Sequence, residues 1–205
     1  MKFKNVWRNL SLSTKLYFIV SIMLLSVLAN LLLLNFAVRM LAASRAGVAA
    51  EGIWLGAHKD AVVALKNFIR SGDPQFYRSF EKIMEVPLGA QQALVAFEKV
   101  PRDLVGVQNG LIQAKIHPYD IENLIQLTEA LDYGFYVKKS FSLWKEGTQV
   151  GSELFALGQK IYRTRVTRSF TPMEREVLSV KIDGLNQRLN QLGKSFSDTL
   201  GDGAR

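Results

Sequence analysis

The chain has 205 residues, of which 48% are hydrophobic, and a formal net charge of +8. It has no cysteine and only two histidines, which excludes disulfides, thiolate metal sites and multi-histidine metal sites. All 18 acidic residues follow Arg39, where 21 Lys and Arg leave a balance of only +3, so the bulk charge does not predict nucleic-acid binding.

Residues 16–38 form a run of 23 side chains without a formal charge. At about 1.5 Å per residue, a helix of this length exceeds the roughly 30 Å of a hydrocarbon core, and no later stretch is apolar enough to cross back. The run therefore predicts one transmembrane helix. A cleaved signal peptide is the alternative, because Ala42, Ala43 and Ser44 offer small residues, but signal cores of about 7–15 residues are shorter.

The basic residues around the span predict its orientation. Residues 1–15 carry four of them and no acid, whereas Arg39 and Arg45 follow the span. Because the more basic flank stays inside, residues 1–15 are expected to be a cytoplasmic tail and residues 39–205 a periplasmic domain. The expected location is a bacterial inner membrane, and the absence of cysteine suits the periplasm.

The outer region reads as helical throughout, without sustained strand alternation. Residues 54–69 place apolar side chains at spacings of three and four, up to Gly72, which can close a helix. Asp73 and Pro74 then start a second helix toward Lys99, which Pro87 is expected to kink or break. Residues 101–131 read as an insert of shorter helices, the first starting at Pro101 and the next at Pro118.

Two further long helices are expected. Residues 132–168 carry two adjacent apolar stripes, so this helix should contact neighbours on two sides. Thr171-Pro172-Met173-Glu174 predicts a capping box. The helix that follows carries a heptad seam: Leu178, Ile182, Leu185, Leu189, Leu192, Phe196 and Leu200. Residues 201–205 read as a loose end. The fold class is thus all-α: the span continues into an antiparallel four-helix-bundle-like domain with a short-helix insert.

No catalytic or metal-binding motif accompanies this fold, so we expect no enzyme activity, no catalytic residues, no metal and no cofactor. His58 has Asp60 close in sequence, but residues two apart on a helix do not face each other. His58 therefore reads as a structural or surface residue, and His117-Pro118-Tyr119-Asp120 as a turn before a capped helix.

Two groups of residues are candidates for ligand binding. Arg163, Arg165 and Arg168 lie in a stretch free of acids between Glu153 and Glu174. They are expected to complement a helix C-terminus, to bind a small anionic ligand, or to contact anionic components of the cell envelope. Trp54, Tyr136 and Trp144 belong to an aromatic set that either packs between helices or lines a small pocket, which is where bundles hold ligands.

Several short motifs resemble sensor regions of bacterial signal transducers. Ser13-Thr14-Lys15-Leu16 before the span is similar to the start of chemoreceptors and sensor kinases, and residues 68–77 resemble the tip of helical extracytoplasmic sensor domains. Residues 117–121 and 143–147 resemble patterns in histidine kinases and diguanylate cyclases. Four positions differ from those patterns, so the resemblance assigns no ligand residue. Residues 196–205 resemble the junction before a second span. The architecture that this resemblance implies continues with that span, a cytoplasmic relay and an output module, so the chain is expected to be either truncated or a product that has lost its output half.

The sequence thus predicts a membrane-anchored extracytoplasmic sensor module that passes a stimulus by helix displacement to an output domain absent from this chain. The expected partners are the lipid bilayer, a second copy in a homodimer, and a small anionic ligand or a periplasmic protein, with no nucleic acid. The alternative is a single-span envelope protein whose helical domain has a structural or assembly role.

Overall fold

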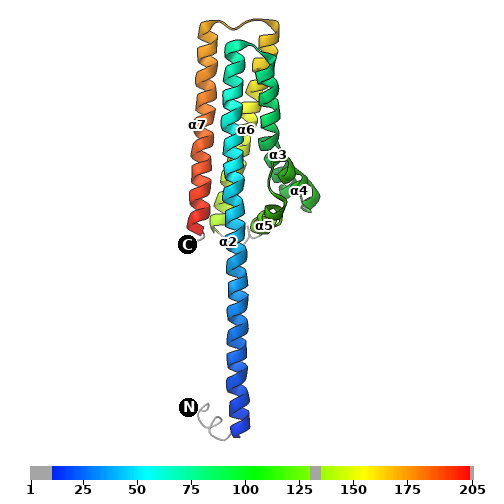
Figure 1. The fold of residues 1–205 in the computed structure, drawn as a ribbon, viewed down its shortest axis with the longest axis vertical. Coiled ribbons are helices and arrows are strands. Elements are labelled where there is room, and N and C mark those ends of the chain that lie inside the picture. The colour runs from blue at the N-terminus through cyan, green and yellow to red at the C-terminus, as the bar shows by residue number, and fades with distance from the viewer. Residues whose placement is uncertain (1–10, 130–134, 204–205) are drawn as a thin grey trace. The chain divides into compact units, whose positions relative to one another are not determined.

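The computed structural model describes residues 11–129 and 135–203, which contain six helices and no strand (Figure 1). The helices are α2 (Leu12–Ser71), α3 (Pro74–Glu98), α4 (Leu104–Gln113), α5 (Pro118–Glu129), α6 (Phe135–Thr167) and α7 (Pro172–Gly203). The predicted all-helical class is confirmed. The predicted boundary between the insert and the next helix, at residues 131 and 132, lies outside the described residues, as does the tail up to residue 10.

The chain divides into two compact units, residues 1–41 and residues 42–205. In the first unit, the Ser11 hydroxyl accepts a hydrogen bond from the Thr14 backbone N–H at 3.2 Å and so caps the start of α2. Every side chain from residue 16 to residue 38 is exposed. Among the described helices, α2 alone is long and apolar enough to cross a membrane.

The second unit is a helical bundle whose first turn follows the predicted signals. Gly72 adopts a φ of 74°, in the left-handed region that suits glycine, and ends α2. Asp73 then caps α3 by accepting a hydrogen bond from the Gln75 backbone N–H at 2.8 Å. Of the two expected effects of Pro87, a kink or a break, the break is wrong, because α3 continues through it to Glu98. The side chain of Pro87 is buried, so packing offsets the loss of one backbone donor.

Contacts between the long helices fix their directions. Lys66 pairs with Asp183 at 2.6 Å, and Glu51 accepts a hydrogen bond from the Ser197 hydroxyl at 3.0 Å, so residues 42–71 of α2 run antiparallel to α7. The α3 and α6 helices are also antiparallel, because the Ser152 hydroxyl donates to the side-chain carbonyl of Gln91 at 2.9 Å and Lys145 pairs with Glu98 at 2.7 Å. Figure 1 shows these segments lying side by side.

One apolar core joins these segments, and it contains the predicted faces. Leu65 and Phe68 of α2, Phe80 and Met84 of α3, and Leu154 of α6 are almost fully buried. Five of the seven heptad positions of α7 belong to this core: Ile182, Leu185 and Leu189 are buried, and Leu178 and Leu192 pack against the cluster. Phe196 is not part of this cluster, and the side chain of Leu200 lies outside the described part of the structure. The burial of these side chains is the main stabilising term of the fold.

The insert packs against α3 as a second cluster. Its first helix begins at Leu104, capped by the Asp103 carboxylate, which accepts from the Gly106 backbone N–H at 2.8 Å; it therefore starts three residues after the predicted Pro101. Gly89 of α3 and Gly110 of α4 meet backbone to backbone, since a Cβ on Gly89 would lie 2.7 Å from the Gly110 carbonyl oxygen.

The turn between α6 and α7 carries the predicted capping box. The Glu174 carboxylate accepts from the Thr171 backbone N–H at 2.8 Å, and the Thr171 hydroxyl accepts from the Glu174 backbone N–H at 3.2 Å. The expected loose end does not begin at Gly201, because α7 extends to Gly203.

Candidate functional site

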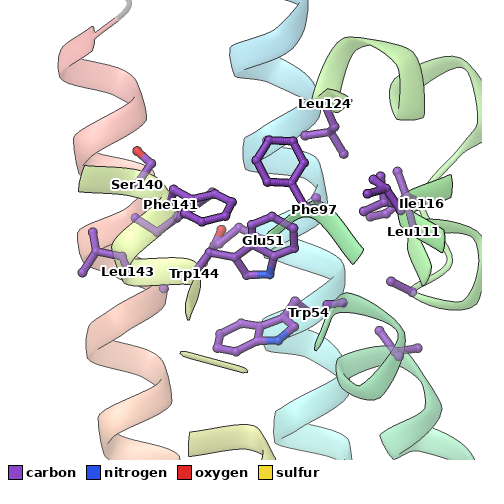
Figure 2. Close-up of a pocket in the computed structure, with 18 of the residues that line it drawn as sticks. Glu51, Trp54, Phe97, Leu111, Ile116, Leu124, Ser140, Phe141, Leu143 and Trp144 are labelled. Atoms are coloured by element: carbon purple, nitrogen blue, oxygen red, sulfur yellow. The ribbon is translucent and has the colours of Figure 1, made fainter. Parts of the chain in front are cut away.

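A cavity of about 110 Å³ lies inside the second unit, and Figure 2 shows the side chains that line it. Its walls include residues of α4 and α5, whose place in the fold is shown in Figure 1. Each of the six helices contributes to its wall. The lining side chains are apolar with few exceptions, and the larger ones are Trp54, Phe97, Leu111, Ile116, Leu124, Phe141, Leu143, Trp144, Leu192 and Phe196. Such a cavity suits an apolar group.

Five aromatic side chains line it, and four of them are labelled in Figure 2: Trp54, Phe97, Phe141 and Trp144. Phe97 of α3 and Phe141 of α6 have ring centroids 5.4 Å apart, and Trp144 meets Phe141 edge to face at 5.6 Å. Trp54 of α2 packs against Gly147 of α6, where a Cβ would lie 2.8 Å from the indole. With Phe196 of α7, the aromatic side chains of the cavity wall come from four helices.

Glu51 alone carries a charge among the described residues that line the cavity. Glu51 is labelled in Figure 2, and its carboxylate accepts a hydrogen bond from the Ser197 hydroxyl of α7 at 3.0 Å. A Cβ on Gly193 would lie 2.8 Å from the Glu51 carboxylate and 2.6 Å from Leu55. Helices α2 and α7 thus approach each other closely at the cavity wall.

His58 lies one helical turn beyond Trp54 and is buried, with 1% of its surface exposed. Its Nδ1 is 2.8 Å from the Trp54 carbonyl oxygen, which makes Nδ1 the protonated nitrogen, while Nε2 has no hydrogen-bond partner. Burial lowers the pKa of His58 to about 4. The hydrogen bond to the Trp54 carbonyl raises this pKa, but by less than burial lowers it. His58 is therefore a neutral core residue at pH 7, as the structural reading of the sequence allowed.

The structure brings two of the three predicted aromatic candidates together at the cavity. Trp54 and Trp144 both line the cavity, whereas the side chain of Tyr136 lies outside the described part of the structure.

The predicted arginines lie at the other end of the second unit, near the Gly72 and Thr171 turns. Arg168 holds Glu174 through two hydrogen bonds of 2.6 and 2.9 Å, which lower the pKa of Glu174 to about 2. Arg165 donates to the Ser169 hydroxyl at 2.7 Å, and Arg163 is exposed. The arginines and the tryptophans therefore do not share one site.

Sequence reasoning missed Glu51 as a candidate. A signal for it exists, because Glu51 is the first acid of the chain and the only one before Asp60. An isolated carboxylate in an otherwise apolar helical stretch is expected to have a specific partner when it is half-buried.

Searches against protein-family models, curated proteins and solved structures find no match to this chain.

Proposed function

We propose that the chain is a membrane-anchored extracytoplasmic sensor module of a bacterial signal transducer, in which ligand binding biases the relation between α2 and α7. The observation that carries this proposal is that Glu51 of α2 and Gly193 of α7 both line the cavity and lie at the contact between the two helices. Beside the wall, Leu55 packs against Gly193 and the Ser197 hydroxyl donates to Glu51. A bound group can stabilise one relative position of these helices, which is the differential affinity that a switch requires.

The exposed apolar side chains of residues 16–38 support a membrane anchor, because a bilayer would remove them from water. We further propose that residues 42–203 are arranged as the antiparallel four-helix bundle of such sensors, with the tail before residue 16 in the cytoplasm and residues 39–205 in the periplasm. A small anionic ligand at Arg163, Arg165 and Arg168 stays a prediction, and Arg168 is already paired with Glu174.

The alternative is a single-span envelope protein with a structural or assembly domain. A distance measurement separates the two. Spin labels on cysteines introduced at the exposed positions Arg45 and Asp202 report on α2 and α7 in full-length protein in lipid nanodiscs. The substitution Ala50→Leu adds volume to the cavity wall. In a sensor, it should shift the label-to-label distance by about 1–2 Å.

The matched control is Val63→Leu, which adds a methylene on the exposed face of α2 and should leave the distance unchanged. An unchanged distance in Ala50→Leu, with the protein folded by circular dichroism, would favour the structural role.

The proposed topology has its own test. Alkaline phosphatase fused after Arg205 is active only outside the cytoplasm, so we expect activity. An inactive fusion, together with a fluorescent cytoplasmic reporter at the same position, would reverse the topology.

A further inference from the structure

We propose that the cavity binds a small organic cation, an aromatic or alkyl amine whose apolar part enters the cavity while its ammonium group pairs with the Glu51 carboxylate. This inference deepens the proposed function by naming the ligand class, although binding itself can be measured without any signalling readout.

The volume of the cavity limits the size of the apolar part of the ligand. Its volume of about 110 Å³ is somewhat smaller than the roughly 150 Å³ of an apolar protein cavity that binds benzene. One aromatic ring or one short branched chain is therefore the largest group that enters without displacing side chains. The surrounding rings of Trp54, Phe97, Phe141 and Trp144 favour such a group through burial and aromatic contact.

The charge of the cavity wall determines which polar group a bound ligand can carry. Glu51 places one carboxylate among apolar groups, and the described residues of the wall include no Lys, Arg or His. A ligand carboxylate would meet a like charge there, whereas an ammonium would supply a charge-assisted hydrogen bond. Trp54 and Trp144 line the same cavity, and a cation–π attraction is strongest for Trp and increases where water is excluded.

The position of Glu51 also explains how binding could reach both helices. Its carboxylate belongs to α2 but already accepts the Ser197 hydroxyl of α7. An ammonium on the same carboxylate would lie at the α2–α7 contact, because Gly193 approaches Glu51 without an intervening Cβ. Ligand charge and helix contact thus depend on one side chain.

The test compares three probes of one shape on full-length protein in phosphatidylcholine nanodiscs: benzylamine, benzyl alcohol and benzoate. Isothermal titration calorimetry measures each affinity, with protein-free nanodiscs as the blank. We expect benzylamine to bind most tightly and benzoate not to bind. In Glu51→Gln, the affinity for benzylamine should fall about tenfold or more, as the loss of a charge-assisted hydrogen bond implies, while that for benzyl alcohol changes less than about twofold.

Glu146→Gln is the matched control. It removes an exposed carboxylate of α6 that does not line the cavity, and it should leave the affinity for benzylamine unchanged. Ala50→Leu tests the location, because filling the cavity should abolish the binding of benzylamine even if Glu51→Gln fails to fold.

Equal affinities for benzylamine and benzyl alcohol in the unmodified chain would overturn the role of Glu51. Absence of binding by all three probes, or full binding in Ala50→Leu, would overturn the cavity as the site. Either result leaves the sensor proposal standing if the Arg45–Asp202 distance still responds to Ala50→Leu, so the two proposals fail separately.

Discussion

At the scale of single residues, His58 shows how burial makes one side chain sensitive to pH. Its imidazole lies between α2 and α6, where Nε2 faces Gly151 so closely that a Cβ there would be 2.7 Å away. A proton on Nε2 would create a charge without a partner in the described structure. The core therefore accepts only the neutral ring.

The expected consequence is a loss of stability in acid. The pKa of His58 is about 4 in the folded chain against 6.5 for an ordinary histidine, so its contribution is complete above pH 6.5 and is lost as the pH falls toward 4. Between pH 7 and pH 5, the free energy of unfolding should fall by about 2 kcal/mol from this residue. Denaturant unfolding of detergent-solubilised protein at both pH values measures the effect.

The comparison variant is His58→Leu, which keeps an apolar group of similar size but cannot titrate. Its stability should depend less on pH than that of the unmodified chain by the same amount. An identical dependence in both proteins would show that His58 is not responsible.

Two glycines offer a second test at this scale. Gly158 of α6 lies against the fully buried Phe80, and an added Cβ would overlap the Phe80 ring. Gly184 of α7 has nothing within 4 Å of the same atom. Gly158→Ala should destabilise the domain by about 1–3 kcal/mol through overpacking, whereas Gly184→Ala should stabilise it by about 0.5–1 kcal/mol through helix propensity. Chemical unfolding of both variants decides, and a stabilised Gly158→Ala would contradict the close contact.

At the scale of elements, α7 contributes to the stability of the bundle through one buried face. Leu189 has no exposed surface, while Val180 on the opposite face is 62% exposed. Leu189→Ala should therefore cost about 2–5 kcal/mol, and Val180→Ala less than about 0.5 kcal/mol. Urea titration followed by circular dichroism measures both, and equal losses would mean that the seam does not face the core.

The elements also show what the sequence could predict. The capping box at Thr171 and Glu174, the cap at Asp73 and the left-handed turn at Gly72 are local, so their residues alone specify them. The continuity of α3 through Pro87 was not predictable locally, because burial of the ring against other helices offsets the missing hydrogen bond. Tertiary packing, and not local sequence, therefore keeps α3 continuous at Pro87.

The candidate site was only half predictable for the same reason. Trp54 and Trp144 stood out as large aromatic side chains in helical stripes, but their meeting at one cavity depends on how α2 and α6 pack. The role of Glu51 could not be predicted, because its hydrogen-bond partner Ser197 lies on α7, 146 positions away in the sequence. Long-range pairing of this kind leaves no periodic signal in the sequence.

At the scale of the whole molecule, the remaining question is how two copies would meet. Val48, Gly52 and Gly56 lie one turn apart along α2, all exposed, and a Cβ on either glycine would contact nothing within 4 Å. Two chains anchored in one membrane point the same way, so their α2 helices would be parallel and equivalent positions would face each other. Small residues let helices approach closely.

We therefore expect a single cysteine introduced at Gly52 to form a disulfide with its counterpart when the full chain in membranes is oxidised, since the chain has no other cysteine. A cysteine at Lys194, exposed on α7, is the control and should crosslink weakly. Asn30→Leu should reduce the yield at position 52, because Asn30 offers an amide for hydrogen bonding between spans; one of its N–H groups donates to the Ser26 carbonyl at 2.8 Å. Equal yields at positions 52 and 194 would count against a dimer through α2 and, with it, against signalling by paired helices.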